Sequence, residues 1–195
     1  MRIIAGSYRS RALAAPPGLA TRPTSDRLRE TLFNVLAPRI QDAVFLDLYA
    51  GSGAVGIEAL SRGAARVEFV ERAPAALAVL SANLAKLGVT AGFRVHNRSV
   101  GAFLQRPRLE DGAGFDLVFL DPPYDADREY AVTMGLLGGD SASVLARGAV
   151  VIAEHRRKEK LEERYGTIER TRLLEQGDAA LSFYGVCGDL AASEA

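Results

Sequence analysis

Apolar and polar residues follow one another along this chain in two alternating periodicities. Short runs of consecutive apolar residues predict buried strands, and longer segments with an apolar residue every third or fourth position predict amphipathic helices. From residue 43 onward, strands and helices are predicted in turn at 43–48, 54–62, 66–70, 73–87, 92–96, 99–105, 115–120, 128–137 and 148–153. Such alternation predicts an α/β fold in which helices cover a mostly parallel sheet.

The beginning of the chain has a different pattern. Residues 2–13 are predicted to form a strand or hairpin, and residues 14–23 an arm that contains proline and glycine. A helix is predicted over 25–37, because Ser25 suits the N-cap position and Pro38 stands at its end. The predicted buried stripe of this helix consists of Leu28, Leu32, Val35 and Leu36.

The last third of the chain contains two apolar segments with no helix between them, near 165–170 and 179–186. These segments predict an antiparallel edge of the sheet. We therefore predict a basic extension over 1–39, a main domain over 40–189 and a frayed tail over 190–195. With 195 residues, of which 48% are hydrophobic, the chain can bury a substantial core in one domain.

A glycine-rich turn follows the first of the alternating strands. Gly51, Gly53 and Gly56 match the G-x-G-x-x-G pattern of dinucleotide-binding proteins, in which a helix N-terminus attracts a pyrophosphate. Asp47, at the end of the preceding strand, argues against that ligand because a carboxylate would repel phosphate. S-adenosylmethionine carries an ammonium and a sulfonium and no phosphate, so an acid beside the glycine turn favours this cofactor.

A second acid, Glu71, ends the next predicted strand, twenty positions after Gly51. An acid at this spacing can accept both ribose hydroxyls of a nucleotide cofactor. The alternative role is that of a helix cap ahead of Pro74, and the two roles are compatible. Nicotinamide and S-adenosylmethionine cofactors would both use Glu71, so Asp47 is the residue that discriminates between them.

Polar residues follow the apolar bodies of four predicted strands, at Asp47, Glu71, Asn97 and Asp121. In open α/β sheets, ligands bind at the carboxyl ends of the strands. We therefore expect these strand ends to form the site, with the end of the third strand flanking an adenine.

The most informative motif is Asp121-Pro122-Pro123-Tyr124, directly after the strand 115–120. The lone pair of a nucleobase amine is delocalised into the ring, so the amine is a poor nucleophile. A carboxylate and a backbone carbonyl on a proline-stiffened segment can accept both of its N–H groups, and Tyr124 can stack on the base. The alternative is a proline-rich turn, with Asp121 as a cap and Tyr124 as a packing residue.

Charge is unevenly distributed in a chain whose formal net charge is zero. The first 39 residues contain seven arginines and two acids, so this segment has a net charge of +5 and the remainder −5. Concentrated arginines indicate a polyanionic partner, although any one of them can belong to an ordinary solvated face. A second basic cluster, at 155–160, is interleaved with acids and is equally well explained as a surface turn.

Other classes of protein are disfavoured by composition. The single Cys187 excludes an intramolecular disulfide, and His96 and His155 have no neighbouring ligands, so no metal is expected. The sequence shows neither an apolar signal segment nor a run of about 18 apolar residues. We expect a cytoplasmic protein, and nothing in the sequence indicates an obligate partner subunit, so a monomer is expected.

Together, Asp-x-x-x-Gly-x-Gly, the acid after the second strand and Asp-Pro-Pro-Tyr resemble the Rossmann-like class I S-adenosylmethionine-dependent methyltransferases. The segments 2–13 and 22–34 narrow this resemblance to the RsmD family of 16S rRNA guanine-N2 methyltransferases, and the match covers nearly the whole chain. It implies a mostly parallel twisted sheet with an antiparallel C-terminal edge and a small N-terminal hairpin and helix extension. It also implies transfer of a methyl group to the 2-amino group of a guanine in the small ribosomal subunit or an assembly intermediate.

The resemblance assigns roles to individual residues. Catalysis is expected from Asp121, Pro122 and Tyr124, by direct displacement without a covalent enzyme intermediate. Cofactor binding is expected from Asp47, Tyr49, Gly51, Gly53, Glu71, Arg72, Asn97, Ser99 and Val100. RNA binding is expected from Arg2, Arg9, Arg11, Arg22, Arg27 and Arg156. Position 99 departs from the family, which usually has Asp or Asn there to hold the adenine amine. The face of the first helix that carries Arg27, Glu30 and Asn34 is expected to line the rim of the active site.

Four alternatives belong to other functional classes. An adenine-N6 methyltransferase shares the Asp-Pro-Pro-Tyr chemistry but normally has a separate DNA-recognition segment, for which this chain has little room. A nicotinamide oxidoreductase is disfavoured by Asp47. A noncatalytic RNA-binding assembly factor would not need Asp121 and Tyr124, and a small-molecule amine methyltransferase would not need the arginine-rich start.

Overall fold

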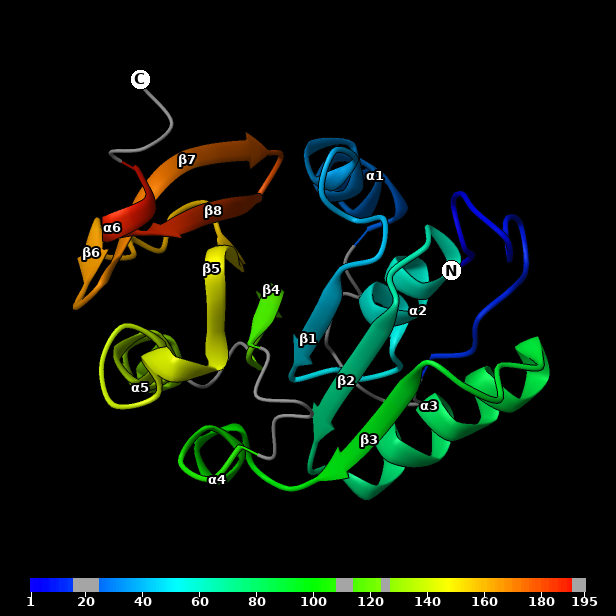
Figure 1. The fold of residues 1–195 in the computed structure, drawn as a ribbon. Coiled ribbons are helices and arrows are strands. Elements are labelled where there is room, and N and C mark those ends of the chain that lie inside the picture. Colours follow the sequence, from blue (N-terminus) through cyan, green and yellow to red (C-terminus); the bar gives the residue numbers. More distant parts are fainter. Residues whose placement is uncertain (16–24, 108–113, 124–126, 191–195) are drawn as a thin grey trace. The chain divides into compact units, whose positions relative to one another are not determined.

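The computed structural model divides into two units, Met1–Ser99 and Val100–Ala195. Three parallel strands form the sheet of the first unit. The strands are β1 (Val44–Leu48), β2 (Arg66–Glu71) and β3 (Phe93–Asn97), in the order β3-β2-β1 (Figure 1). The structure describes residues 1–15, 25–107, 114–123 and 127–190.

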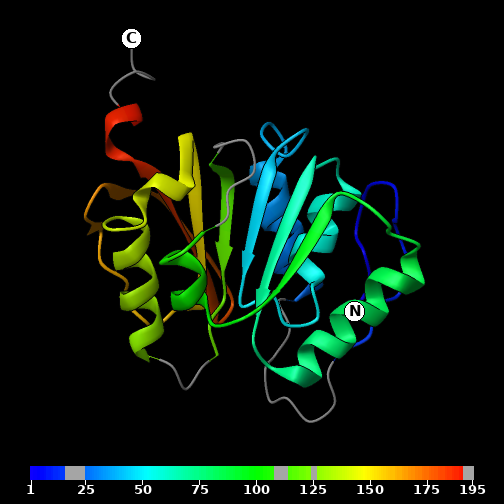
Figure 2. The same ribbon diagram turned by 60° about the horizontal axis from the view of Figure 1, so that its bottom comes forward.

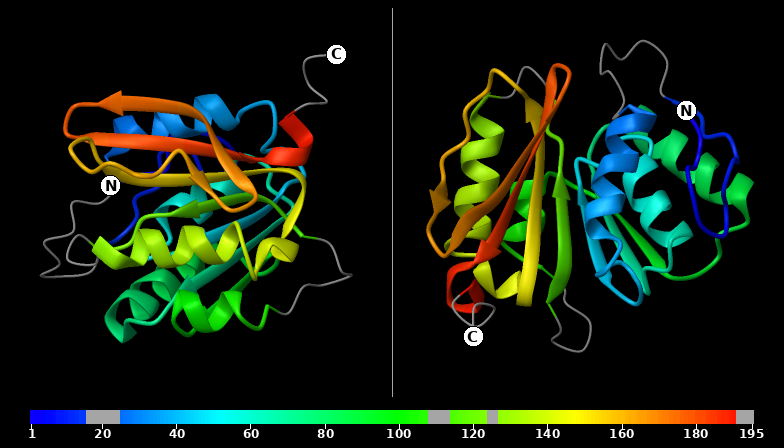
Figure 3. Two further views of the ribbon diagram at one scale, coloured as in Figure 1. Left: turned by 90° about the vertical axis from the view of Figure 1, so that its left-hand side faces the viewer. Right: turned by 90° about the horizontal axis from the view of Figure 1, so that it is seen from above.

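Three helices cover one face of this sheet: α1 (Asp26–Leu36), α2 (Ala54–Ser61) and α3 (Pro74–Leu87) (Figure 3). The rings of Phe33 in α1 and Phe45 in β1 stack with centroids 6.5 Å apart. Gly56 of α2 lies so close to Phe69 in β2 that an added Cβ would be 2.3 Å from the ring. Because side chains alternate along a strand, Asp47 faces the same helices as Phe45.

Helix α1 forms where the sequence predicts it. The Ser25 hydroxyl caps its N-terminus by accepting from the N–H of Leu28 (3.1 Å), and the helix ends before Pro38. Its buried residues are Leu28, Arg29, Leu32, Phe33 and Leu36. The predicted Val35 is half-buried, and the prediction missed Arg29 and Phe33. Arg27, Glu30 and Asn34 are exposed on another face, as expected.

The N-terminal segment forms a hairpin-like loop, closed by one antiparallel bridge between Arg2 and Ala12. The loop is attached to two helices of the same unit. Arg11 donates to the carbonyls of Leu87 and Lys86 at the end of α3 (both 3.3 Å). Figure 3 shows the segment alongside α2 and α3. The predicted hairpin is thus present, although without a long ladder of strand pairing.

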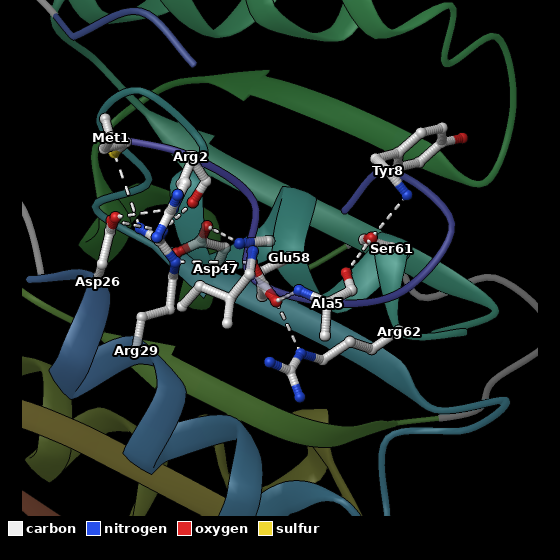
Figure 4. A network of polar contacts seen from close by, with 12 residues as sticks. Met1, Arg2, Ala5, Tyr8, Asp26, Arg29, Asp47, Glu58, Ser61 and Arg62 are labelled. Atoms are coloured by element: carbon white, nitrogen blue, oxygen red, sulfur yellow. Dashed lines mark hydrogen bonds and ion pairs between the residues drawn. The ribbon is translucent and has the colours of Figure 1, made fainter. Parts of the chain in front are cut away.

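A buried ion-pair network joins this segment to α1 and α2 (Figure 4). The side chains of Arg29 and Glu58 are both fully buried, with Arg29 Nε 3.7 Å from Glu58 Oε2. Glu58 also accepts from the backbone N–H groups of Ile4 (2.8 Å) and Ala5 (3.0 Å). Arg62 Nε donates to the other carboxylate oxygen at 2.7 Å. Several donors therefore compensate the desolvation of a single carboxylate.

The second unit contains a five-stranded sheet in the order β4-β5-β8-β7-β6. β4 (Phe115–Leu120) and β5 (Leu145–Arg156) are parallel, and the other neighbours are antiparallel. The remaining strands are β6 (Arg164–Tyr165), β7 (Ile168–Gln176) and β8 (Ala179–Val186). The predicted antiparallel edge is confirmed, with the short β6 in addition to the two predicted strands.

Helices α4 (Val100–Leu104) and α5 (Asp127–Leu137) also belong to this unit, with the 3-10 helix η2 (Ala142–Val144) and the short α6 (Cys187–Leu190). Figure 2 shows α5 beside β5, and the Tyr130 hydroxyl donates to the Glu154 carbonyl at 2.7 Å. β5 is longer than the predicted 148–153, and α6 extends into the predicted tail. No helix in the described ranges is long and apolar enough to cross a membrane.

Removal of the Glu58 carboxylate should destabilise the protein strongly. In Glu58→Ala, the N–H groups of Ile4 and Ala5 and the Nε of Arg62 lose their acceptor, and the buried Arg29 guanidinium loses an ion-pair partner. We expect the free energy of unfolding to fall by about 3–5 kcal/mol, measured by urea denaturation. Glu30→Ala, at an exposed position of α1, should change it by less than about 0.5 kcal/mol. Equal effects of the two substitutions would contradict the assigned role of Glu58.

Candidate active site

Asp47 lies at the end of β1 beneath the start of α2 and is 2% exposed. Its Oδ2 accepts from the backbone N–H of Gly56 at 2.8 Å. The N-cap residue of α2, Gly53, has no side chain that can satisfy the first N–H groups of the helix. Asp47 therefore caps α2 from the neighbouring strand, nine positions away in the sequence.

Burial raises the pKa of Asp47 from 3.8 to about 7. The hydrogen bond from Gly56 lowers the pKa and the nearby charge of Glu71 raises it, but desolvation is the largest effect. At neutral pH the carboxyl group is therefore close to the midpoint of its titration. A cation placed beside the carboxyl group would favour its ionised form and would form an ion pair with it.

Glu71 is half-buried and connects the glycine turn to the end of β2. Its Oε2 accepts from the N–H of Gly51 (2.9 Å), and its Oε1 accepts from the N–H groups of Arg72 (2.7 Å) and Ala73 (2.8 Å). The predicted capping role ahead of Pro74 is thus present. A carboxylate offers about four lone-pair sites. These three bonds leave acceptor capacity for a ligand hydroxyl.

The glycine turn requires its glycines for two physical reasons. Gly51 (φ 56°) and Gly53 (φ 78°) have left-handed backbone conformations, and a Cβ on Gly53 would be 2.2 Å from Leu80 Cδ1. Tyr49 adopts a similar φ of 61°, which is uncommon for a bulky residue. Strained backbone of this kind is concentrated at functional sites. The turn is therefore held in an unfavourable conformation by its surroundings.

The donor set of this turn fits a cationic cofactor better than a pyrophosphate. The N–H group of Gly51 in the turn and that of Gly56 in the first turn of α2 already donate to the carboxylates of Glu71 and Asp47, so neither is available to a phosphate. An added phosphate would also meet two acids. The same acids suit the ammonium, sulfonium and ribose hydroxyls of S-adenosylmethionine.

Asn83 in α3 is a supporting residue that sequence reasoning missed. It is 1% exposed, and its side-chain amide donates to the carbonyls of Ser52 (3.0 Å) and Ala14 (3.1 Å). Its oxygen accepts from the N–H of Ala14 at 2.8 Å. Asn83 thus links the glycine turn to the N-terminal segment. Its sequence signal is a polar residue on the apolar stripe that contains Leu80, Leu84 and Leu87.

The other residues predicted to bind the cofactor lie at or just after strand ends. Arg72 and Asn97 are exposed after β2 and at the end of β3, and Ser99 is half-buried. Val100 begins α4 in the second unit, and its side chain is 4% exposed. Val100 is therefore a packing residue of its unit, and any polar contact it makes comes from its backbone.

The Asp-Pro-Pro segment begins at the residue after β4 in the second unit. Asp121 is half-buried, Pro122 is buried and Pro123 is exposed. Asp121 thus stands at the carboxyl end of a buried strand, as predicted. Tyr124 lies outside the described residues.

The structure sorts the predicted RNA-binding arginines by exposure. Those exposed are Arg2, Arg9, Arg11, Arg27 and Arg156, while Arg22 lies outside the described residues. Arg29, one of the seven N-terminal arginines, is buried and pairs with acids, so it does not contribute to a basic surface. In the 155–160 cluster, His155 is buried, its Nε2 is 2.9 Å from Ser182 Oγ, and desolvation lowers its pKa.

A family model described as conserved hypothetical protein 95 matches residues 1–185 of this chain. The chain belongs to this family, which is the RsmD family. The "Putative rRNA methyltransferase YlbH" of Bacillus subtilis is 35% identical over 94% of this chain and 98% of its own length. The "Ribosomal RNA small subunit methyltransferase D" of Escherichia coli is 47% identical over 64% of this chain and 60% of its own length.

Solved structures share the fold of this chain. The "Putative methyltransferase yhhF from Escherichia coli" has a TM-score of 0.80 and 36% identity, covering 95% of this chain and 97% of that one. A Haemophilus influenzae methylase structure has a TM-score of 0.77 and 32% identity, with 95% and 98% covered. The structure of "SMU.776, a putative methyltransferase complexed with SAH" has 13% identity and a TM-score of 0.65, covering 81% of this chain and 49% of that one, and so shares the fold alone. The predicted Rossmann-like methyltransferase fold is confirmed.

The buried acid should give stability a measurable pH dependence. The pKa of Asp47 is higher in the folded protein than its ordinary value of 3.8, so the folded state retains a proton that the unfolded state has lost. Stability should therefore decrease as pH rises from about 4 to about 7, by at most about 4 kcal/mol from this group. Asp47→Asn retains an acceptor for the N–H of Gly56 but cannot ionise. Its stability should therefore not decrease over this pH range.

Urea denaturation of the wild type and Asp47→Asn at pH 5 and pH 8 measures the effect. From pH 5 to pH 8, the free energy of unfolding should decrease in the wild type but not in the variant, because an amide does not ionise. A difference between the two proteins that stayed constant with pH would show that Asp47 titrates normally.

Proposed function

We propose that this protein transfers a methyl group from S-adenosylmethionine to the N2 amine of a guanine in 16S rRNA, in the cytoplasm. The observation that carries the proposal is the pair of carboxylates at this site: Glu71 accepts from the N–H of Gly51 in the glycine turn, and Asp47 accepts from the N–H of Gly56 in α2. The printed names of the relatives support rRNA of the small subunit as the substrate. The sequence Asp121-Pro122-Pro123-Tyr124 supports an exocyclic amine as the acceptor.

The proposed roles in cofactor binding follow from the chemistry of each residue. Asp47 attracts the cationic end of the ligand, and Glu71 accepts from ribose hydroxyls with its remaining lone pairs. Tyr49, Gly51 and Gly53 shape the turn, while Arg72, Asn97, Ser99 and Val100 border the nucleoside. When bound, the cofactor would supply an electrophilic methyl group on its sulfonium, and S-adenosylhomocysteine would leave with the electron pair of the broken S–C bond.

The proposed roles in catalysis concern the amine. The Asp121 carboxylate and the Pro122 carbonyl accept its two N–H groups, which localises the nitrogen lone pair away from the ring. Pro123 stiffens the segment that holds both acceptors, and Tyr124 provides a surface for the base. The nitrogen gains positive charge during transfer, and the Asp121 carboxylate stabilises that charge and can take the released proton.

The guanine must be unpaired or flipped out of a helix before its amine is accessible. The exposed arginines at positions 2, 9, 11 and 27, with Arg156 and Arg22, are the proposed contacts to RNA phosphates. The proposed particle is the small ribosomal subunit or an assembly intermediate, and the protein acts as a monomer. The basic extension over 1–39 and the main domain over 40–189 remain the proposed division of the chain.

Substitution of Asp121 should separate catalysis from cofactor binding. Asp121→Ala removes one of two amine acceptors and the counter-charge, so we expect methyl transfer to fall by at least about 100-fold. S-adenosylmethionine affinity, measured by titration calorimetry, should remain unchanged. The control Asp140→Ala removes an exposed acid of the same unit and should leave both values at the wild-type level. Near wild-type transfer by Asp121→Ala would exclude this residue from catalysis.

The methylated nucleoside identifies the reaction. Small subunits or 16S rRNA that lack the modification are incubated with the protein and isotopically labelled cofactor, and the digested nucleosides are analysed by mass spectrometry. The proposal requires N2-methylguanosine. Labelled N6-methyladenosine would instead assign the protein to the adenine methyltransferases, and no labelled nucleoside would favour a noncatalytic assembly factor.

Substitution of Asp47 should act on binding first. Asp47→Ala removes the buried counter-charge, and we expect S-adenosylmethionine affinity to fall by about tenfold or more in titration calorimetry. The affinity for NAD should be undetectable in the wild type. Unchanged S-adenosylmethionine affinity in a folded Asp47→Ala protein would remove Asp47 from the cofactor site.

A further inference from the structure

We propose that Tyr8, at the tip of the N-terminal loop, is a stacking site for an unpaired base of the RNA substrate. This inference rests on the proposed function for the nature of the ligand, and it adds a base contact to the expected phosphate contacts. It depends on three observations: the rigid attachment of the loop, the orientation of the tyrosine ring and the charge of the segment that carries it.

Ser61, the last residue of α2, holds the loop at three points (Figure 4). The Ser61 hydroxyl donates to the Ala5 carbonyl (2.5 Å) and accepts from the N–H of Tyr8 (3.0 Å). The Ser61 carbonyl accepts from the N–H of Ser7 at 2.7 Å. Gly6 adopts φ +84°, and a Cβ on it would be 1.7 Å from the Ser61 carbonyl oxygen. The loop is therefore fixed before any ligand binds.

The tyrosine ring does not take part in this attachment. In Figure 4 the backbone N–H of Tyr8 points at Ser61, and the ring extends away from Ser61 and Glu58. The residue is half-buried, and within the described part of the chain its hydroxyl has no hydrogen-bond partner. A rigid backbone thus presents an aromatic side chain whose hydroxyl is not bound by any residue that the structure describes.

The segment that carries Tyr8 is strongly basic. Residues 1–15 contain Arg2, Arg9 and Arg11 and no acid. Arg9 is exposed next to Tyr8, whereas the Arg11 guanidinium binds the carbonyls of Leu87 and Lys86. An aromatic side chain on a basic segment is a combination with which proteins bind single-stranded nucleic acid. The charge favours RNA as the occupant over a protein partner.

Rigidity explains how one tyrosine can contribute measurably to binding. A base that stacks on a mobile loop must first order that loop, and the ordering costs free energy. Here the hydrogen bonds with Ser61 have already fixed the backbone of Ala5, Ser7 and Tyr8. The stacking contact is then available to the ligand without that loss.

The sequence contains no tryptophan, which allows a direct test. In Tyr8→Trp, the single indole retains the stacking ability and reports on its surroundings by fluorescence. We expect titration with a short single-stranded RNA of mixed sequence to quench this fluorescence and to protect the indole from acrylamide. A duplex of the same length and the polyanion heparin should bind with much less quenching, because neither presents an unpaired base.

A matched variant controls for quenching by mere association. Val132→Trp places a single indole on α5, where Val132 is 53% exposed, and its fluorescence should not respond to the RNA. The proposal is overturned if RNA binds, as judged by anisotropy of a labelled strand, while the Tyr8→Trp signal stays constant. Equal quenching of both variants, equal quenching by heparin, or absence of RNA binding at low salt overturns it as well.

Kinetics provide a second readout that a structural role would not reproduce. Tyr8→Ala should raise KM for the RNA by at least about fivefold, the lower limit for one stacked base, with little change in kcat. Tyr8→Phe should retain the wild-type KM, and S-adenosylmethionine affinity should stay constant in both. If the wild type methylates RNA but Tyr8→Ala has an unchanged KM, the stacking site is wrong and the proposed function stands. If no RNA is methylated but RNA still quenches the Tyr8→Trp fluorescence, the proposed function is wrong and the stacking site stands.

Discussion

The first unit depends on carboxylates buried against helix α2. Asp47 satisfies an N–H group at the start of the helix, and Glu58, in its second half, accepts from the backbone of the N-terminal segment. Both side chains are nearly inaccessible to water. Burial of an acid is unfavourable unless donors surround it, so each carboxylate fixes the position of the segments that provide those donors. This requirement holds β1, α1, α2 and residues 1–8 in one arrangement.

Because of these buried contacts, the two ends of the short helix α2 support two segments with different proposed functions. The N-terminal end of α2 follows the glycine turn, whose conformation Asp47, Glu71 and Gly53 enforce. Its C-terminal residue, Ser61, holds the loop that carries Tyr8. Asn83 adds a second link, because one side chain binds both Ser52 of the glycine turn and Ala14 of the N-terminal segment. The glycine turn and the loop that carries Tyr8 thus share their supports within the first unit.

The sequence was sufficient to predict features that depend on local pattern. The strands and helices from residue 43, the Ser25 cap and the antiparallel C-terminal strands follow from periodicity and from residue preferences at helix ends. It was insufficient where a polar residue is buried by a distant partner. Arg29 was counted among the basic surface residues, yet Glu58, which lies 29 positions later, makes its burial possible. Asn83 was missed for the same reason, since its partners are backbone groups of distant segments.

The ionisable nature of Asp47 is best explained by a ligand. An asparagine could accept the same hydrogen bond from Gly56 without the cost of desolvating a charge, so the fold itself gains nothing from an acid at this position. Burial raises its pKa to about 7, which means that the free protein holds the carboxylate at an energetic disadvantage. A bound cation removes this disadvantage, because the ionised form then has a partner. In the proposed cofactor site, the acid thus lowers the stability of the free protein and favours a positively charged ligand over a pyrophosphate.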